Sequence, residues 1–263
     1  MREQTGRFRA LHGDGIFVMP NPWDVGSARF LASLGFPALA TTSSGHAATL
    51  GRPDQSVTRD ELLAHAEALV TAVDVPINVD AERCFADDAN GVAETVRLIA
   101  NTSAAGCSIE DYDPATGRID PTDRATERVA AAAQAARQTG LVLTARAENH
   151  LYGIDDLDDT ISRLSAYRDA GADVVYAPGL IDLDDIARVV QEVRIPVNVL
   201  ARPDAPSVSE LASVGVRRVS TGGALTRAAF DTLKRAAREL LDHGTSSYAT
   251  NAITEAELTA AFR

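Results

Sequence analysis

The stretch Pro76-Ile77-Asn78-Val79-Asp80-Ala81-Glu82 enters an apolar run through a proline and ends it with two carboxylates. Short hydrophobic runs of this kind are typical of buried parallel strands. The same arrangement recurs at Gly106-Cys107-Ser108-Ile109-Glu110-Asp111. Because α/β proteins carry their functional groups at the carboxyl ends of their strands, we expect these acids at the functional end of a sheet or barrel.

Asp80, Glu82 and Glu110 would then point toward one place from two neighbouring strands. Carboxylates gathered in this way raise each other's pKa unless a cation neutralises them. A hard, oxygen-rich site of this kind suits Mg²⁺ or Mn²⁺. The sequence therefore predicts a metal site, and the alternative interpretation is a set of solvated loop acids or helix caps.

Strand-like runs alternate with segments of helical period from Gly15 onward, which is the pattern of repeated strand–helix units. The expected strands cover residues 16–19, 38–41, 76–82, 106–110, 141–146, 173–176, 196–200 and 216–220. The expected helices cover residues 25–34, 58–73, 89–100, 121–138, 155–170, 183–193, 207–214, 224–241 and 254–262. Residues 46–57 and 111–120 are expected to form long loops.

Eight such units in 263 residues predict a (β/α)₈ TIM barrel with an extra C-terminal helix. We expect residues 1–243 to form the catalytic barrel domain and residues 244–263 to form a linker and a helix that packs on a neighbouring subunit. Polar residues lie at or just beyond the predicted strand ends, as an active-site ring requires: Asn21, Ser43, Ser44, Asp80, Glu82, Glu110, Arg146, Asn198 and Ser220.

The composition excludes several classes of protein. A net charge of -12 disfavours nucleic acid as a partner, because phosphate binding requires a basic patch. Neither a membrane span nor a secretory signal is evident, so a cytoplasmic location is expected. The two cysteines, Cys84 and Cys107, match no zinc pattern. Lys234 is the only lysine and falls on the last expected barrel helix, so an aldolase of the Schiff-base type, which needs a lysine on a strand, is nearly excluded.

Seven short motifs occur in order along the chain: Asn21-Pro22-Trp23-Asp24, Thr42-Ser43-Ser44-Gly45, Leu50-Gly51-Arg52-Pro53-Asp54, Val79-Asp80-Ala81-Glu82, Ile109-Glu110-Asp111, Ala145-Arg146-Ala147-Glu148 and Pro196-Val197-Asn198-Val199. Together they resemble the isocitrate lyase and phosphoenolpyruvate mutase superfamily, a group of Mg²⁺-dependent barrel enzymes acting on 2-oxo acids and related carboxylates. The likeness extends over most of the chain.

The resemblance implies that Asp80 binds the metal directly, while Glu82 and Glu110 hold metal-bound waters. It also implies a substrate-binding set, in which a hydroxyl and backbone amides hold the substrate carboxylate: Trp23, Ser43, Ser44, Gly45, Arg146 and Asn198. For the serines, the alternative is that they only cap a turn.

The resemblance further implies catalytic roles for three residues. Arg146 would grip the substrate's oxyanion or carboxylate, and the alternative is a buried structural ion pair. Asp54 matches an aspartate on the loop over the active site. Glu148 either acts as a base or only pairs with Arg146. Superfamily members commonly form tetramers in which a C-terminal helix crosses to a neighbouring subunit, and we expect a homo-oligomer here.

The chain departs from the family lyases in the loop after the second acid pair. Those enzymes carry a cysteine there, within Lys-Lys-Cys-Gly-His or Lys-Arg-Cys-Gly-His, for proton transfer. Residues 112–120 of this chain contain no lysine, cysteine or histidine. The resemblance is therefore to a phosphonomutase-like branch without this cysteine. A glutamate expected on the sixth strand is also missing, with Ala177 and Pro178 in its place.

These features predict a Mg²⁺-dependent lyase or mutase that cleaves or forms a carbon–carbon or carbon–phosphorus bond in a 2-oxo acid or related carboxylate. An enolate-like intermediate would be stabilised by the metal and by Arg146. The alternatives are a hydrolase or decarboxylase of oxaloacetate- or phosphonopyruvate-like substrates, or a non-catalytic barrel that binds carboxylates.

Overall fold

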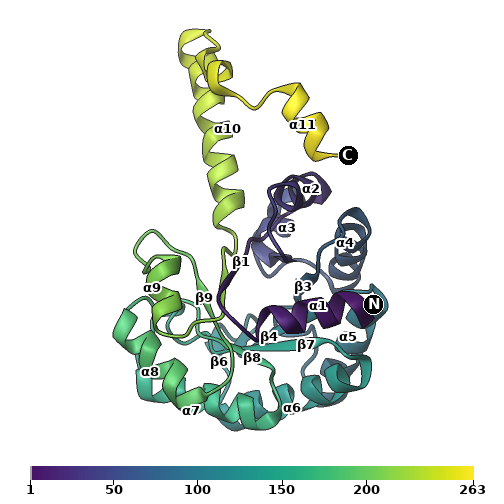
Figure 1. Cartoon of the computed structure of the whole chain (residues 1–263), viewed down its shortest axis with the longest axis vertical. Coiled ribbons are helices and arrows are strands. Elements are labelled where there is room, and N and C mark those ends of the chain that lie inside the picture. The colour runs from purple at the N-terminus through teal and green to yellow at the C-terminus, as the bar shows by residue number, and fades with distance from the viewer. Residues whose placement is uncertain (1) are drawn as a thin grey trace.

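A sheet of eight parallel strands forms the centre of the computed structural model, which describes residues 2–263 (Figure 1). The strands are β1 (Phe17–Met19), β2 (Leu39–Ala40), β3 (Ile77–Asp80), β4 (Gly106–Glu110), β7 (Val142–Arg146), β8 (Val174–Tyr176), β9 (Val197–Leu200) and β10 (Arg218–Ser220). They follow one another in chain order around the sheet, and β1 pairs with β10. Between the two remaining edges, the Ala40 N–H donates to the Pro20 carbonyl over 3.1 Å and closes the barrel.

Helices surround this barrel and connect its strands. They are α1 (Arg2–Leu11), α2 (Val25–Ser33), α3 (Ser43–Thr49), α4 (Arg59–Ala72), α5 (Ala89–Asn101), α6 (Thr122–Thr139), α7 (Leu157–Ala170), α8 (Leu183–Val193), α9 (Val208–Ser213), α10 (Ala224–His243), the 3₁₀ helix η1 (Ser247–Asn251) and α11 (Glu255–Ala261). No helix in residues 2–263 is both long and apolar enough to cross a bilayer. The eight predicted strands and the TIM-barrel fold are confirmed.

Three local elements differ from the sequence-based expectation. The N-terminal helix α1 was not expected, and α3 occupies part of the segment expected to be a loop. Thr42 caps α3, because its side chain accepts from the Gly45 N–H at 3.3 Å. The expected loop at 111–120 contains a short antiparallel hairpin of β5 (Tyr112–Asp113) and β6 (Arg118–Ile119). The capping box expected from Thr58 and Glu61 at the start of α4 is present.

Helix α1 closes the amino-terminal end of the barrel. Phe8 is fully buried and belongs to a cluster with Phe17, Ala105 and Val142, which lie at or next to the first residues of their strands. His12 packs edge-on against Phe8, with ring centroids 4.9 Å apart. Because one end is sealed in this way, a ligand can reach the barrel interior only from the carboxyl end.

Side chains along each strand alternate between the barrel interior and the surrounding helices, as the two-residue period of a strand requires. In β3, for example, Val79 packs in the core under the helices, whereas Asn78 and Asp80 line the interior cavity. In β4, Ile109 packs outward and Ser108 lines the cavity. The carboxyl half of the barrel therefore encloses a chamber with many polar side chains. The amino end is filled by the apolar cluster around Phe8, and the main apolar core lies between strands and helices.

The C-terminal segment leaves the barrel as a long arm. Figure 1 shows α10 projecting away from the barrel and α11 turning back toward α2. The Arg29 guanidinium donates to the Phe262 carbonyl at 3.2 Å, which fixes α11 beside α2 within the same chain. Large apolar side chains on α10, including Phe230, Leu233 and Leu241, are exposed. The arm is thus helical as expected, with an apolar surface that this single chain leaves uncovered.

Candidate active site

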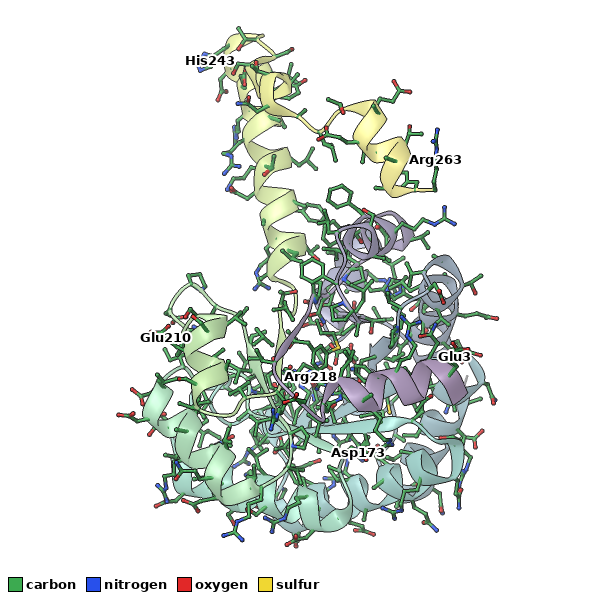
Figure 2. All side chains as sticks on the ribbon, in the orientation of Figure 1. Glu3, Asp173, Glu210, Arg218, His243 and Arg263 are labelled. Atoms are coloured by element: carbon green, nitrogen blue, oxygen red, sulfur yellow. The ribbon has the colours of Figure 1, made fainter. Side chains whose placement is uncertain are left out.

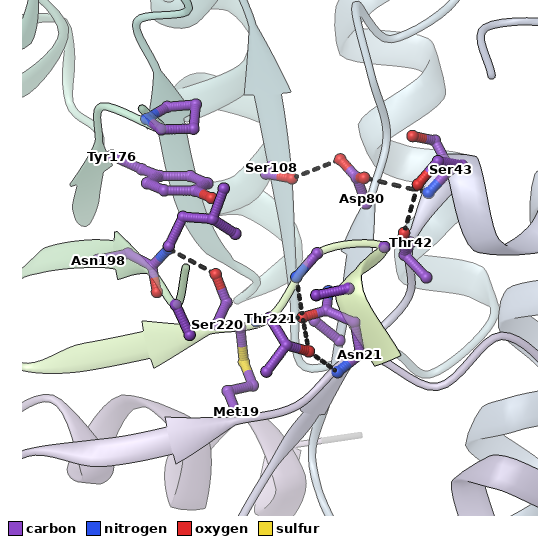
Figure 3. A pocket seen from close by; sticks show the side chains of 18 of the residues that line it. Met19, Asn21, Thr42, Ser43, Asp80, Ser108, Tyr176, Asn198, Ser220 and Thr221 are labelled. Atoms are coloured by element: carbon purple, nitrogen blue, oxygen red, sulfur yellow. Dashed lines mark hydrogen bonds between the residues drawn. The ribbon is translucent and has the colours of Figure 1, made fainter. Parts of the chain in front are cut away.

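A cavity of about 450 Å³ opens at the carboxyl ends of the strands. Figure 3 shows its lining, to which strands or strand ends from all sides of the barrel contribute. Among the residues singled out from the sequence, the cavity is lined by Asn21, Ser43, Ser44, Asp54, Asp80, Arg146, Asn198 and Ser220. Side chains far apart in the sequence are therefore brought to one chamber.

Asp80 occupies the end of β3 and receives hydrogen bonds from several directions. The Ser43 backbone N–H donates to its Oδ2 at 3.2 Å, and the Ser108 hydroxyl lies 3.3 Å from its Oδ1 (Figure 3). The backbone N–H of Asp80 contacts the Thr41 hydroxyl at 2.8 Å. These contacts fix the carboxylate against the cavity wall, in an orientation that does not depend on a ligand.

Arg146 ends β7 and contacts three carboxylates at once. Its nitrogens lie 2.8 Å from Asp80, 3.3 Å from Glu110 and 2.7 Å from Glu148. The strand register explains the second contact, since Glu110 and Arg146 are direct partners in the β4–β7 ladder. The guanidinium also lies over the Tyr176 ring, 5.3 Å from its centroid. Arg146 is thus held at the centre of the acid cluster.

Negative charge exceeds positive charge in this cluster. Besides the three carboxylates that Arg146 contacts, Glu82 and Asp54 also interact electrostatically with it. Burial, and then the charges of Asp80 and Asp54, raise the pKa of Glu82 to about 8. Burial raises the pKa of Glu148 to about 7 even though Arg146 opposes the shift. The carboxyl groups of Glu82 and Glu148 therefore keep their protons near neutral pH unless a further cation neutralises the cluster.

Burial also raises the pKa of two other acids in the cluster. The pKa of Glu110 lies well above its ordinary range despite Arg146, since Glu148, Asp80 and Glu82 add to the effect of burial. The pKa of Asp54 is raised by burial and by Asp80, and a hydrogen bond with Ser43 opposes this shift. Together these acids form a site whose charge a divalent cation would balance.

The donor set fits Mg²⁺ or Mn²⁺ held mostly through water. No group of three or more His, Cys, Asp or Glu side chains in residues 2–263 is arranged to hold a metal directly. Mg²⁺ commonly keeps several waters and uses only one or two protein carboxylates. Asp80 lines the main cavity, whereas Glu82 lines a smaller adjoining pocket and Glu110 is buried behind it. This arrangement is compatible with one direct ligand and two acids that hold waters.

The remaining sequence-predicted residues have different positions. Gly45 is buried, and a Cβ there would lie 2.5 Å from Thr42 and 2.6 Å from Thr226, so packing requires a glycine. Trp23 does not line the main cavity but a separate apolar pocket with Phe262. Glu148 is buried, accepts from Arg146 and donates its own N–H to Asp111 at 2.8 Å. The structure therefore gathers the other predicted residues at or directly behind the cavity, with Trp23 outside.

Besides Tyr176, four residues at the site were not singled out from the sequence. Gln55 donates to Glu110 at 2.9 Å, Ser108 contacts Asp80, and Thr41 holds the backbone of β3. Arg218 is buried in the barrel interior and also lines the cavity. The one local signal for Arg218 is that it stands two residues before Ser220 and therefore on the same face of the strand, although Arg217 beside it makes this signal ambiguous.

Comparison with known proteins gives a consistent result. The sequence model of the family "phosphoenolpyruvate phosphomutase" matches residues 8–241. An oxaloacetate decarboxylase from Bradyrhizobium sp. (strain ORS 278) is 30% identical over 250 residues, which cover 90% of this chain and 84% of the relative.

Solved structures show the same similarity. A Burkholderia cenocepacia J2315 protein assigned as a lyase or mutase superposes with a TM-score of 0.94 and 48% identity, covering 98% of this chain and 95% of that one. An oxaloacetate acetylhydrolase bound to its product oxalate superposes with a TM-score of 0.88 and 25% identity, covering 98% of this chain and 93% of that one. The relatives with named reactions are enzymes.

Proposed function

Because the chain belongs to the phosphoenolpyruvate phosphomutase family, we propose that it is a Mg²⁺-dependent enzyme that cleaves or forms a carbon–carbon or carbon–phosphorus bond in a 2-oxo acid or related carboxylate. The observation that carries this proposal is the excess of carboxylates around Arg146 at the mouth of a polar chamber. Such a site suits a reaction in which a cation is bound and negative charge develops beside it.

Asp80 would hold the metal, with Glu82 and Glu110 orienting its waters. A bound Mg²⁺ would supply Lewis-acid polarisation of the substrate's oxygen atoms. The hydrogen bonds from Ser43 and Ser108 already hold Asp80 in place. Little reorganisation of the protein is then needed when metal and substrate bind, which is how a preorganised site lowers a barrier.

Arg146 would stabilise negative charge on the substrate. Its planar guanidinium offers two parallel N–H groups to a carboxylate or an oxyanion, a geometry that lysine cannot reproduce. Glu148 holds the Nε side of this group at 2.7 Å and does not line the cavity. Glu148 therefore acts by orienting Arg146, and Asp54, which lines the cavity and has a raised pKa, is the better candidate for proton transfer.

Decarboxylation or hydrolysis of an oxaloacetate-like substrate is the second candidate. It is favoured by the β5–β6 hairpin, which stands where family lyases carry their proton-transferring cysteine and contains none. Loss of CO₂ would leave an enolate whose charge a bound cation and Arg146 stabilise, and the proton that converts it to the product can come from water, so no acid from this loop is needed. The oxaloacetate decarboxylase and acetylhydrolase relatives support this alternative.

A release assay tests the proposal. Oxaloacetate, phosphonopyruvate and branched 2-hydroxy acids are incubated with the protein, and pyruvate and oxalate are measured with Mg²⁺ and with EDTA. We expect at least one substrate to be consumed only with Mg²⁺ and not by the matched variant Asp80→Asn. No metal-dependent release from any of them would favour a non-catalytic carboxylate-binding barrel.

A further inference from the structure

Arg218 places a positive charge deep inside the barrel. Its side chain is 1% exposed, and Figure 2 labels it within the barrel. The Nε–H donates to Asn198 Oδ1 at 2.9 Å, and an Nη2 hydrogen goes to the Thr144 hydroxyl at 2.8 Å. An Nη1 hydrogen points to His12 Nε2 at 3.3 Å. Because a guanidinium has five N–H groups, one hydrogen on each terminal nitrogen has no protein acceptor among these contacts.

None of these partners neutralises Arg218. The Nδ1 atom of His12 lies 2.9 Å from the Phe8 carbonyl, so Nδ1 carries the hydrogen and Nε2 accepts from Arg218. Burial and Arg218 lower the pKa of His12 to about 3, so that this ring is neutral. Among residues 2–263, no carboxylate forms an ion pair with Arg218. A buried charge without a counterion is costly, which indicates that its counterion comes from outside the chain.

The contact with Arg218 fixes which end of the Asn198 amide faces each way. Arginine can only donate, so Oδ1 must face Arg218, and the Nδ2 group faces Ser220, to which it donates at 2.8 Å (Figure 3). The amide therefore presents its nitrogen side toward Ser220, and the Ser220 oxygen is used as an acceptor.

The hydroxyls of Ser220 and Tyr176, close to Asn198, also have hydrogens available for a ligand. The Ser220 hydroxyl accepts from Asn198, so its own hydrogen is left for another acceptor. Burial raises the pKa of the Tyr176 hydroxyl, which lies close enough to Ser220 for their interaction to oppose this shift. Two hydroxyls that face each other can use at most one of their hydrogens between them. Both side chains line the cavity, as Arg218 does. Unused donors thus gather on β8 and β10, whereas carboxylates contact Arg146 from the ends of β3 and β4. Tyr176 lies between the two groups, since it is the strand partner of Arg146.

We propose that Arg218, with Ser220 and Tyr176, forms a second anion subsite that binds a carboxylate of the substrate other than the one beside Asp80 and Arg146. The assignment rests on the proposed function and adds a specificity determinant to it. Substrates with a further carboxylate are selected over those with a hydrogen atom in its place. Arg218 is a binding residue here, and the charge on the substrate supplies its missing counterion.

Unreactive pairs of ligands test this subsite. Lactate and malate share a 2-hydroxy acid group, and malate adds one carboxylate; 2-hydroxybutyrate and 2-hydroxyglutarate extend the comparison by one methylene. Dissociation constants are measured by calorimetry on the full-length protein with Mg²⁺. For the wild type we expect at least one dicarboxylate to bind about tenfold or more tightly than its monocarboxylate partner. A ratio near one for both pairs overturns the proposal.

Two variants locate the effect. In Arg218→Gln the ratio should fall close to one while the affinity for lactate is kept, and a folded variant that retains the wild-type ratio contradicts the assignment. Should that variant not fold, Ser220→Ala decides, because it removes one donor without a buried charge; the ratio should fall about threefold. Ser108→Ala is the matched control, since it removes a hydroxyl from the Asp80 side of the same cavity and should leave the ratio unchanged.

Two further measurements complete the test. The first shows whether the subsite binds a substrate carboxylate or a free anion, and the second separates the effect of the subsite from that of the metal. If a free inorganic anion fills the subsite, chloride raises the melting temperature of the wild type but not of Ser220→Ala, and the wild-type ratio stays near one; this result overturns the assignment to substrate. Repeating the titrations in EDTA addresses the proposed function separately. Unchanged lactate affinity in EDTA shows that the metal takes no part in binding, which contradicts the proposed function. The ratio of monocarboxylate to dicarboxylate dissociation constants reports only on the subsite.

Discussion

The two sides of the cavity use polar groups in opposite ways. At the ends of β3, β4 and β7 the contacts are ionic, with Arg146 within 3.3 Å of Asp80, Glu110 and Glu148. At the ends of β1, β9 and β10 they are neutral: Asn21 accepts from the backbone of Thr221 at 2.9 Å and donates to the Thr41 carbonyl at 2.7 Å. The ionic side is suited to bind a cation and to stabilise negative charge that develops on the substrate. The neutral contacts of Asn21 hold the loops at the strand ends, and deeper on β10 the guanidinium of Arg218 forms no ion pair with a carboxylate of residues 2–263.

Asp80→Asn should have the largest effect on the ionic side. The amide keeps the shape of the side chain but removes the charge that would bind the metal. It can also accept at only one of the two positions to which the Ser43 N–H and Arg146 donate. We expect Mg²⁺-dependent binding of oxalate, an enolate mimic, to weaken by roughly 10²-fold or more. Calorimetry measures this affinity. Wild-type affinity in the variant would show that the metal is held elsewhere.

Arg146→Lys should follow in size. Lysine keeps the charge but loses the planar fork, so kcat/KM should fall by roughly 10²-fold while the fold survives. Turnover per folded molecule and melting temperature are measured together. The opposite pattern, an active but unstable variant, would mean that the contacts with Asp80, Glu110 and Glu148 serve only the core.

Glu82→Gln should reveal the excess of negative charge through pH. The folded protein holds a proton on Glu82 up to a pKa of about 8, whereas the unfolded chain releases it near the ordinary value of 4.5. Stability is therefore present at low pH and is lost as pH rises between these values. Melting temperatures of the metal-free wild type should fall from pH 5 to pH 8, less steeply in Glu82→Gln. Parallel curves would contradict the shift.

Truncation before Thr254 should affect the chemistry least and assembly most. We propose a homo-oligomer, with a tetramer expected, because the α10 side chains Phe230, Leu233 and Leu241 are exposed. The truncation keeps this face but removes Leu258 and Phe262, which are expected to pack on a neighbouring subunit and which within one chain share a pocket with Trp23 and Phe30. Light scattering should show a smaller assembly than for the full-length chain. A monomer in both cases refutes the proposal.

The barrel could be predicted because its strands are short apolar runs bounded by proline, glycine and acids, as at Pro76 and Asp80. Helix α1 was missed, since its ten residues are rich in charge and its few buried residues gain meaning only against the barrel end. Helix α3 was missed because Ser43, Ser44 and Gly45 favour turns, and the Thr42 cap and packing against Thr226 decide the outcome.

The sequence predicts which residues stand at the strand ends of the site. It does not predict which side chains from different strands contact each other. Asp80 and Arg146 stand at strand ends in the sequence, but their 2.8 Å contact follows from the barrel's registers. The position of Trp23 depends on where α11 lies, which local sequence does not determine. The Arg218 network joins residues from α1, β7, β9 and β10, so no local pattern reveals it.

Metal-dependent binding of oxalate to the wild-type protein tests the central claim most directly. The acid cluster around Arg146 predicts that oxalate binds when Mg²⁺ or Mn²⁺ is present and that binding is lost in EDTA. Calorimetric titration of the same protein under both conditions gives the answer. Equal oxalate affinity with metal and with EDTA would contradict the proposed metal site, because Arg146 alone would then suffice to hold the ligand.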